Sequence, residues 1–427
     1  MTKRLFTTLC GLVFLVNFGR VAFAPLVPEF QQDLGISAAA VGSVTTLVWL
    51  GTAAPRIPIG WVLTRVRRER VVLATGVALS AAAALTATAQ SLLALRTGAF
   101  AVGLATGGYF VAAIPLIGTL YPERTGRAVG VHGTASQVAS VLAPALVLAV
   151  IGRLGDWRIV FWALAVAAAL STASLVLVLR RGGGGGPRVA DGGTRDEGDP
   201  SGPADGAAEP ANDLDTAGTP PEPRSFLSAL SHWRIVLAGM SLVAVAGFAW
   251  QGVFNFYVSY LLSEGLSTAN ANLLLTVAFA AGVPAFWLGG RLADRLPNVP
   301  YLLALNATFL ASLVALTYAG SLAAFALVSV VIGYAAHALF PAVDTYMLST
   351  LPAADRASAY AVFSGASLLF EANGSGVVGA LTDAGVGFDR VFRLFAVAVA
   401  AVLVLAALLY VVGRFPTPLD HEPPIDG

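Results

Sequence analysis

Twelve long apolar runs follow one another along the chain, separated by short polar connections. They cover residues 5–28, 39–63, 71–90, 93–119, 129–151, 158–180, 233–261, 270–289, 299–318, 322–349, 357–382 and 391–413. Each run is long enough for a helix that crosses the hydrocarbon of a membrane, which takes about 20 residues. None of them alternates apolar and polar residues as a barrel strand does. The pattern therefore predicts an all-α membrane protein with twelve transmembrane helices.

The composition agrees with this pattern, since 57% of the residues are hydrophobic and only 11% are charged. An ordinary soluble domain does not have this balance. The first run continues through Arg20 and Pro25 without a small-residue cleavage site, so we expect a retained helix and not a signal peptide. The net charge of +1 argues against a nucleic-acid partner. The single cysteine, Cys10, excludes an internal disulfide and a cysteine-rich metal site, and we expect no cofactor.

Arginines gather in particular connections between the runs. They follow run two (Arg65, Arg67, Arg68, Arg70), run four (Arg124, Arg127) and run eight (Arg291, Arg295). Positive connections face the cytoplasm in multi-pass proteins. We therefore expect both termini in the cytoplasm and a multi-pass protein of the plasma or inner membrane.

One long segment between the runs differs from the rest in composition. Residues 182–224 are rich in Gly, Pro, Ala and acids and have no apolar periodicity, which is typical of a disordered acidic linker. We therefore expect the chain to divide into four parts: a six-helix bundle over 1–181, a cytoplasmic linker over 182–224, a second six-helix bundle over 225–414, and a cytoplasmic tail over 415–427. A regulatory role for the linker and a plain tether both stay open.

The two halves repeat each other at an offset close to 230. Gly60 matches Gly290, and Pro122 matches Pro352, at corresponding places in the order of runs. An even repeat of six spans gives both halves the same orientation, with a binding site at their interface near the middle of the membrane.

The connection after run eight carries a sequence motif. Gly290-Arg291-Leu292-Ala293-Asp294-Arg295 has the pattern G-x-L-A-D-R, and residues 60–65 (GWVLTR) with Arg68 are its copy after run two. The chain thereby resembles the major facilitator superfamily of secondary transporters. Arg96, followed by Gly103, Gly107 and Gly108 in run four, and Asp156-Trp157-Arg158 before run six are also similar to that family.

The resemblance implies two six-helix bundles and a gate at the cytoplasmic side. The implied gating residues are Gly60, Arg65, Arg68, Gly290, Asp294 and Arg295. Two positions depart from the family pattern: Thr64 stands where the first copy has Asp, and Phe100 where the fourth helix has Gly. The second copy is intact, so we assign the gating role to Asp294 and Arg295. The arginines of residues 64–70 can equally serve only to keep their connection on the cytoplasmic side.

Four ionisable side chains inside the runs are functional candidates, because such groups are costly in a membrane. Glu371 in run eleven can bind and release a proton in a low-dielectric cavity, or it can form a structural pair with an arginine of the other half. His337 in run ten can relay protons or can be a neutral, hydrogen-bonded residue. Asp344 can take part in proton coupling, pair with Arg356, or cap the inner end of run ten. Arg20 in run one is a cationic group near the middle of the membrane.

The cationic candidates Arg20 and Arg56 lie in the first half and the acidic ones in the second, which favours an anion as the substrate. The segment around Arg56 resembles the second-helix arginine segment of nitrate/nitrite porters, but run eight has no partner arginine before Arg291. Gln251, Asn255 and Tyr257 in run seven suit a polar organic ligand, although Tyr257 can also belong to an interfacial aromatic belt.

The sequence does not contain the motifs of other classes of membrane protein. The only lysine is Lys3, so the chain contains no phosphate-cradling Gly-x4-Gly-Lys segment for a pump that uses nucleotides. It also has no His-Glu-x-x-His and no Gly-x-Ser-x-Gly, so we do not expect an enzyme.

The sequence predicts a secondary active transporter that moves a small solute across the bilayer by alternating access. Proton coupling, or coupling to another ion, is expected, and a small nitrate-like or carboxylate anion is favoured as the substrate. A proton-coupled exporter of drugs or sugars and a non-transporting membrane sensor on the same fold are the alternatives. The resemblance implies a monomer.

Overall fold

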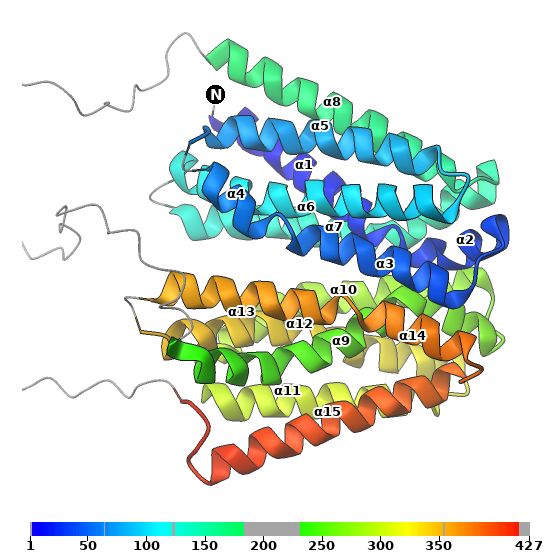
Figure 1. Cartoon of the computed structure of the whole chain (residues 1–427), viewed down its shortest axis with the longest axis vertical. Helices are drawn as coiled ribbons and strands as arrows, with labels where there is room; N and C mark the ends of the chain where they lie inside the picture. The colour runs from blue at the N-terminus through cyan, green and yellow to red at the C-terminus, as the bar shows by residue number, and fades with distance from the viewer. Residues whose placement is uncertain (1, 64, 122–123, 183–230, 353–354, 418–427) are drawn as a thin grey trace, which may run out of the picture.

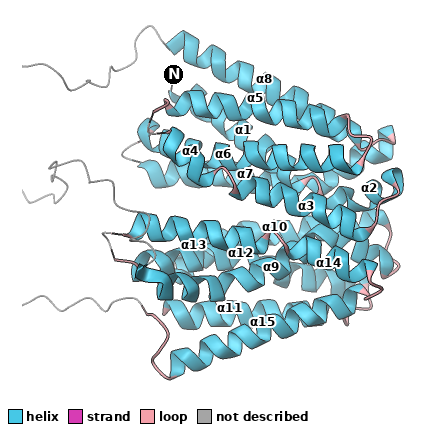
Figure 2. Cartoon of the chain, viewed as in Figure 1, coloured by secondary structure: helices cyan, strands magenta, loops and turns pink. Residues whose placement is uncertain are grey.

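The computed structural model describes residues 2–63, 65–121, 124–182, 231–352 and 355–417, and all regular elements in these ranges are helical (Figure 2). The first half contains α1 (Thr2–Val21), η1 (Ala24–Leu26), α2 (Val27–Leu34), α3 (Ala38–Ala53), α4 (Arg56–Val62), α5 (Arg68–Ala87), α6 (Leu92–Leu120), α7 (Thr125–Leu154) and α8 (Arg158–Gly182). The second half contains α9 (Trp233–Ser263), α10 (Thr268–Ala293), α11 (Asn298–Leu316), α12 (Leu322–Thr350), α13 (Arg356–Glu371), α14 (Gly374–Asp383) and α15 (Phe388–Val411). The predicted all-α class is confirmed, while the predicted linker lies almost entirely outside the described residues.

Every apolar run coincides with one helix or with consecutive helices. Ten stretches in the described ranges are long and apolar enough to cross a membrane, and the first of them is Thr2–Leu34. The other two runs, 39–63 and 357–382, are each broken into two shorter helices, α3 with α4 and α13 with α14. The number of twelve spans therefore stays a prediction.

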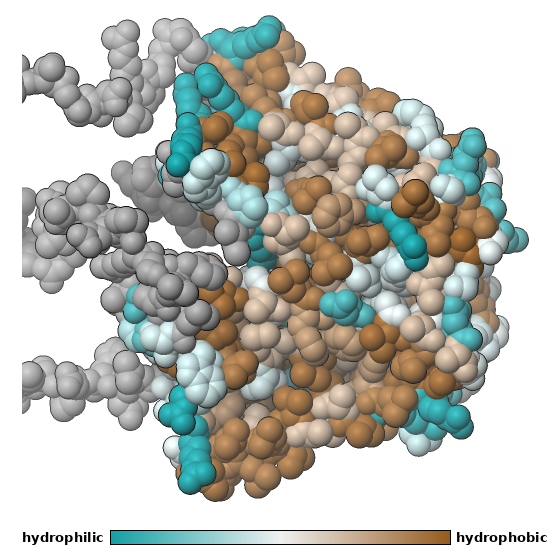
Figure 3. Space-filling model, viewed as in Figure 1, coloured by the Kyte–Doolittle hydropathy of each residue, from teal (hydrophilic) through white to brown (hydrophobic). Residues whose placement is uncertain are grey.

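The outer surface suits a lipid environment. Hydrophobic side chains predominate over the middle of the face seen in Figure 3, and hydrophilic side chains gather toward its two ends. Large apolar residues such as Leu170 and Val397 are each 66% exposed on long helices. A soluble monomer rarely exposes so much contiguous apolar surface.

The helices run between two ends of the molecule. We call one the basic end, because the connections with Arg65–Arg70 and Arg291–Arg295 lie there together with the N-terminus; the opposite end, with Ser37 and Asp383, is the far end (Figure 1). The helices of each half pack mainly on one another. The halves meet chiefly where α3 packs on α14 and α7 packs on α10.

The internal repeat is visible in how the helices begin. Ser37 and Ser267 start α3 and α10, and Ser91 and Ser321 start α6 and α12; each hydroxyl accepts a hydrogen bond of 3.2–3.3 Å from the N–H three residues later. Such caps satisfy a backbone donor that the helix itself leaves unpaired. Each pair is 230 positions apart, the same offset that relates the sequence motifs.

The two broken runs have different causes. Pro55 lies directly between α3 and α4. It has no N–H to donate, and its ring is incompatible with the helical position of the carbonyl four residues earlier, so the helix breaks here. Between α13 and α14 no proline is present, and the N–H of Asn373 donates to the carbonyl of Phe370 at 3.2 Å, a tighter turn than that of an α-helix. Gly374 then starts α14 in contact with the backbone of α9.

The glycine that starts α14 gives the first testable prediction. A Cβ atom at Gly374 would lie 1.9 Å from the carbonyl oxygen of Phe248, so Gly374→Ala should force the backbones of α9 and α14 apart. We expect a loss of about 1–3 kcal/mol in stability, as for other overpacked interiors, seen as a lower melting temperature of the purified protein in detergent.

Gly365, in the preceding helix α13, is the matched control. A Cβ atom there meets nothing within 4 Å, so Gly365→Ala should leave the melting temperature unchanged or raise it, because alanine favours a helix by up to about 1 kcal/mol. Equal melting temperatures for the two variants would contradict the close packing of α14 on α9.

Candidate functional site

Arg20, near the end of α1, is held between aromatic rings of the first half. Its guanidinium carbon lies 4.3 Å from the ring centroid of Trp49 on α3 and 5.7 Å from that of Phe110 on α6. Its Nη2 donates to Oδ1 of Asn17 at 2.5 Å, one turn earlier on the same helix. The Nε atom is buried and has no hydrogen-bond partner in the described part of the chain.

Arg56, the first residue of α4, reaches toward the second half. It donates a short hydrogen bond to the hydroxyl of Ser364 on α13. It also lies near enough to Asp344, Tyr360 and Glu371 to interact with them electrostatically. The break after α3 therefore brings a cation of the first half to the acids of the second.

The two acids of the second half have different surroundings. Asp344 on α12 accepts a 2.7 Å hydrogen bond from the Tyr360 hydroxyl. Arg356, considered above as its partner, donates instead to the carbonyl of Leu351 at 3.3 Å. Glu371 is 5% exposed and packs on Gly247 of α9, where a Cβ would lie 2.5 Å from its Cδ. Among the described residues, no hydrogen bond and no ion pair within 4.0 Å is made by the Glu371 carboxyl.

His337 on α12 lies among aromatic rings. Its Nδ1 is 2.7 Å from the carbonyl oxygen of Gly333 and therefore donates its proton there. The ring centroids of Trp250, Phe279 and Phe286 lie 5.6, 6.1 and 6.0 Å from that of the imidazole. This environment fits a neutral, hydrogen-bonded histidine and leaves Nε2 as the only ring nitrogen open to a further partner.

The three polar residues predicted on α9 bond within the second half. Asn255 donates 2.8 Å to the carbonyl of Gln251 and 2.9 Å to the hydroxyl of Ser375 on α14. The Tyr257 hydroxyl is 2.7 Å from that of Ser329 on α12. All three side chains are buried, and those of Asn255 and Tyr257 join α9 to other helices of the same half.

An aromatic row connects the site across the two halves. The ring of Trp49, over which the guanidinium of Arg20 lies, packs edge to face on Phe254 of α9 with 6.0 Å between ring centroids. Phe254 lies 5.7 Å from Trp250, which in turn contacts His337. The candidates from both halves thus belong to one contiguous region, in which no group of three His, Cys, Asp or Glu side chains could hold a metal among the described residues.

Comparison with known proteins places this arrangement in a family. The profile of the Major Facilitator Superfamily matches residues 9–305 and 239–424, which together cover nearly the whole chain. The chain belongs to the Major Facilitator Superfamily. This confirms the resemblance that the motif at Gly290–Arg295 carried, and the members of this family are transporters and not enzymes.

Two curated relatives of this superfamily transporter are similar over part of their length. "Probable sulfoacetate transporter SauU" of Cupriavidus necator is 24% identical over 294 residues, which are 67% of this chain and 64% of that protein. "Uncharacterized transporter YgaY" of Escherichia coli O157:H7 is 28% identical over 158 residues, or 35% of this chain and 38% of that one. The chain spans less than two thirds of the length of each relative.

Two solved structures resemble the transporter along nearly its whole length. They are a bacterial homolog of the human lysosomal transporter Spinster, in inward-facing occupied and unoccupied conformations. The TM-scores are 0.72 and 0.70 at 18% sequence identity, with 98% and 99% of both chains covered. At this identity the likeness shows the fold alone.

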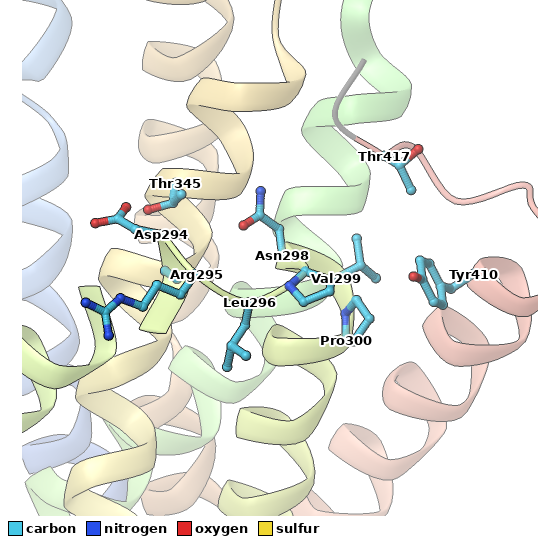
Figure 4. A pocket seen from close by; sticks show the side chains of 11 residues that line it. Asp294, Arg295, Leu296, Asn298, Val299, Pro300, Thr345, Tyr410 and Thr417 are labelled. Atoms are coloured by element: carbon cyan, nitrogen blue, oxygen red, sulfur yellow. The ribbon is translucent and has the colours of Figure 1, made fainter. Parts of the chain in front are cut away.

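The loop motif that includes Asp294 and Arg295 lies at the basic end, away from Arg20 and Glu371. Asp294 and Arg295 line a cavity of about 720 Å³ with Thr345, Tyr410 and other residues of the second half (Figure 4). Neither forms an ion pair within 4.0 Å in the part of the chain that the structure describes. The gating role of Asp294 and Arg295 therefore stays a prediction.

The two copies of the motif share one local contact. Arg65 stacks on Trp61 with 3.8 Å to the ring centroid, and Arg291 stacks on Trp287 at 3.9 Å. Arg68 donates to the carbonyl of Pro115 on α6 at 3.3 Å. These arginines are thus anchored within their own halves, while Gly60 and Gly290 lie in the last turns of α4 and α10.

Four residues of the site were not predicted from the sequence. Asn17 had a local signal, because it lies one helical turn before Arg20 on the same face. Trp49, Ser364 and Tyr360 had none, because their roles come from contacts between helices that are distant in the sequence.

Proposed function

We propose that this transporter binds a small organic anion at Arg20 and moves it across the membrane by alternating access. The proposal rests on one observation: the buried Nε of Arg20 has no partner within the described ranges, on a guanidinium that forms no ion pair there. A buried unpaired donor is unfavourable. A carboxylate or sulfonate oxygen would satisfy it with a charge-assisted hydrogen bond.

The substrate class follows from the shape of this group. A guanidinium presents its donors in a planar fork, which suits the oxygens of a carboxylate, a sulfonate or nitrate. The relative named as a sulfoacetate transporter supports an organic acid, and the rings of Trp49 and Phe254 offer contact to a short carbon body. Arg56 lies near enough to Arg20 for their charges to interact, so it adds positive potential to the same region.

The membrane arrangement belongs to the same proposal. Twelve spans form two six-helix bundles, residues 1–181 and 225–414, in a plasma or inner membrane. The linker 182–224, the tail 415–427 and both termini are cytoplasmic. The arginines of the basic end support this orientation, because positive connections stay on the cytoplasmic side. Asp294 and Arg295 act at the gate of that end, and the protein works as a monomer.

Proton coupling is assigned first to Glu371, and Asp344 and His337 on α12 are the further candidates for it. Glu371 is buried, has no hydrogen bond to the described residues, and interacts with Arg56 of the other half. A protonated Glu371 no longer attracts Arg56, so protonation changes the attraction between the halves. Substrate and proton then bias the same equilibrium between states that face the two sides of the membrane.

Removal of the Arg20 guanidinium tests the anion site. The parent chain, in detergent, should be stabilised against heat by at least one of sulfoacetate, acetate and nitrate, since a ligand that binds only the folded state raises its stability. In Arg20→Ala this shift should disappear, because a charge-assisted hydrogen bond contributes about 1.5–3 kcal/mol, or roughly 10- to 100-fold in affinity.

Arg153→Ala, which removes an exposed arginine near the far end, is the control and should respond like the parent. An unchanged anion response in Arg20→Ala would refute the site. A shift only with lipophilic cations or sugars would favour the drug or sugar exporter, and binding without flux in vesicles would favour the sensor.

Replacement of the Glu371 carboxyl tests the coupling. Glu371→Gln keeps the size of the side chain but cannot ionise, so uptake into proteoliposomes should lose its dependence on pH and on an imposed proton gradient. Glu264→Gln changes an exposed carboxyl at the far end and should transport like the parent. If uptake by Glu371→Gln follows pH as uptake by the parent does, another group carries the proton.

A further inference from the structure

Asn17 is the best-connected polar side chain next to the proposed anion site. It is 0% exposed, and all of its hydrogen-bonding capacity except one lone pair is used. Its Nδ2 donates 2.7 Å to the carbonyl of Ser136 and 2.7 Å to the hydroxyl of Ser140, both on α7, while Oδ1 accepts from Arg20. Asn17 thus connects the guanidinium to a helix that Arg20 does not itself bond to.

These contacts fix the orientation of the guanidinium. Trp49 covers it at 4.3 Å, and Asn17 holds Nη2, so two independent contacts determine its plane and its rotation. The Nε donor is left unpaired as a consequence of this orientation. A flexible arginine could instead turn Nε toward a carbonyl of its own half.

The type of side chain at position 17 is also significant. An amide oxygen accepts a hydrogen bond without cancelling the positive charge of Arg20, whereas a carboxylate at the same place would form an ion pair with it. The site therefore keeps its full attraction for an external anion. We infer that Asn17 is a positioning residue, which orients Arg20 for the substrate through its amide and keeps the arginine unneutralised; this inference rests on the function proposed above.

A double-mutant comparison tests whether Asn17 acts through Arg20. The dissociation constants of sulfoacetate and acetate are measured for the parent, Asn17→Leu, Arg20→Lys and the double variant. Asn17→Leu should weaken binding at least tenfold in the parent background. With Arg20→Lys, which keeps the charge but lacks the planar fork, the same change should cost less than about threefold, because the group that Asn17 orients is gone.

Two more variants separate positioning from helix packing. Ser140→Ala removes a contact of Asn17 to α7 but not its bond to Arg20, so it should lower the melting temperature and leave anion affinity within about twofold. Asn17→Asp should bind the anion more weakly than Asn17→Leu. Affinities that simply follow the melting temperatures, or an equal cost of Asn17→Leu in both backgrounds, would overturn the positioning role.

The outcomes also distinguish this inference from the proposed function. If neither anion binds the parent, the proposed function and the inference about Asn17 are both wrong. If the parent binds an anion, Arg20→Ala does not, and Asn17→Leu costs the same in both backgrounds, only the inference about Asn17 is wrong.

An independent set of contacts joins the two halves at the far end. Asp383, the last residue of α14, accepts 2.9 Å hydrogen bonds from the N–H groups of Ala38 and Ala39, the first two residues of α3. The Ser37 hydroxyl also bonds to this carboxyl. A carboxylate of the second half thus caps a helix of the first, where unpaired donors and the helix dipole attract negative charge.

The helix backbones touch beside this cap. A Cβ atom at Gly379 would lie 2.2 Å from the carbonyl oxygen of Ala38, and one at Gly42 would lie 2.6 Å from that of Ser375. Such an approach of α3 and α14 is possible only with glycine at both places. An opening of the far end has to separate these backbones and release the cap together.

We propose that Asp383 is a latch that holds the far end closed and that is released when the transporter opens to that side. The bonds from Ser37 and from the Ala39 and Ala38 amides keep the pKa of Asp383 below its usual range. A lowered pKa means that the latch is fully formed above the ordinary pKa of an aspartate and is lost as the pH falls through the lowered one. The latch therefore stays charged near neutral pH, and proton coupling acts elsewhere.

Distance measurements between spin labels test the latch. Labels at Gln32→Cys and Arg390→Cys, exposed positions near the far end of each half, are introduced together with Cys10→Ser. Asp383→Ala should increase at least threefold the fraction of molecules with a longer distance between the labels. Glu264→Ala, which removes another exposed carboxyl at that end, should leave the distribution unchanged.

Gly379→Val serves as the second variant, because its side chain cannot fit against Ala38 when the far end is closed. It should shift nearly all molecules to the longer distance. If Gly379→Val gives the shift and Asp383→Ala gives the parent distribution, the glycine contact alone closes the far end and Asp383 is no latch.

Discussion

Inside a membrane, a backbone N–H or C=O that leaves a helix must find another partner in the protein, and this constraint organises the molecule. The two broken runs lie where the halves meet, and at one of them the other half supplies a partner for the backbone. Beyond the break between α13 and α14, the N–H of Gly376 donates 3.1 Å to the hydroxyl of Thr46 on α3. The interruption is thus compensated by a hydrogen bond inside the protein.

The same breaks determine where the central charges stand. Arg56 is the first residue of α4, directly after one break, and Glu371 is the last residue of α13, directly before the other. A helix dipole disfavours a cation at its N-terminus and an anion at its C-terminus. Each of the two charges is therefore poorly stabilised by its own helix and gains from the other, so the interaction between the halves is sensitive to the state of either group.

The apolar runs predicted nearly all of the helices, because the length and hydropathy of a membrane helix are local properties of the sequence. The break at Pro55 had a local cause, but the one at Asn373 did not, since it depends on the contact of Gly374 with α9. For the candidate site, the ionisable residues inside the runs gave Arg20, Glu371, His337 and Asp344, because a charge is conspicuous in an apolar segment. Arg56 was added from the contrast of charge between the halves. Trp49, which acts through a neutral contact, gave no such signal, and Asn17 had one only through its place one turn before Arg20. The Asn255 amide donates to the Ser375 hydroxyl on α14, and that hydroxyl donates to the backbone carbonyl of Gln251.

The charges of the central region restrict how substrate and proton can be combined. Arg20 and Arg56 belong to the first half, and Asp344 and Glu371 belong to the second. When all four side chains are ionised, their charges balance. A monovalent anion at Arg20 adds one negative charge to a region of low dielectric, where uncompensated charge is costly. A proton on Glu371 removes one negative charge and restores the balance, and it also frees Arg56 from its attraction to that carboxyl. In the proposed mechanism, the anion and the proton therefore stabilise each other in the site, which favours their movement in the same direction over exchange.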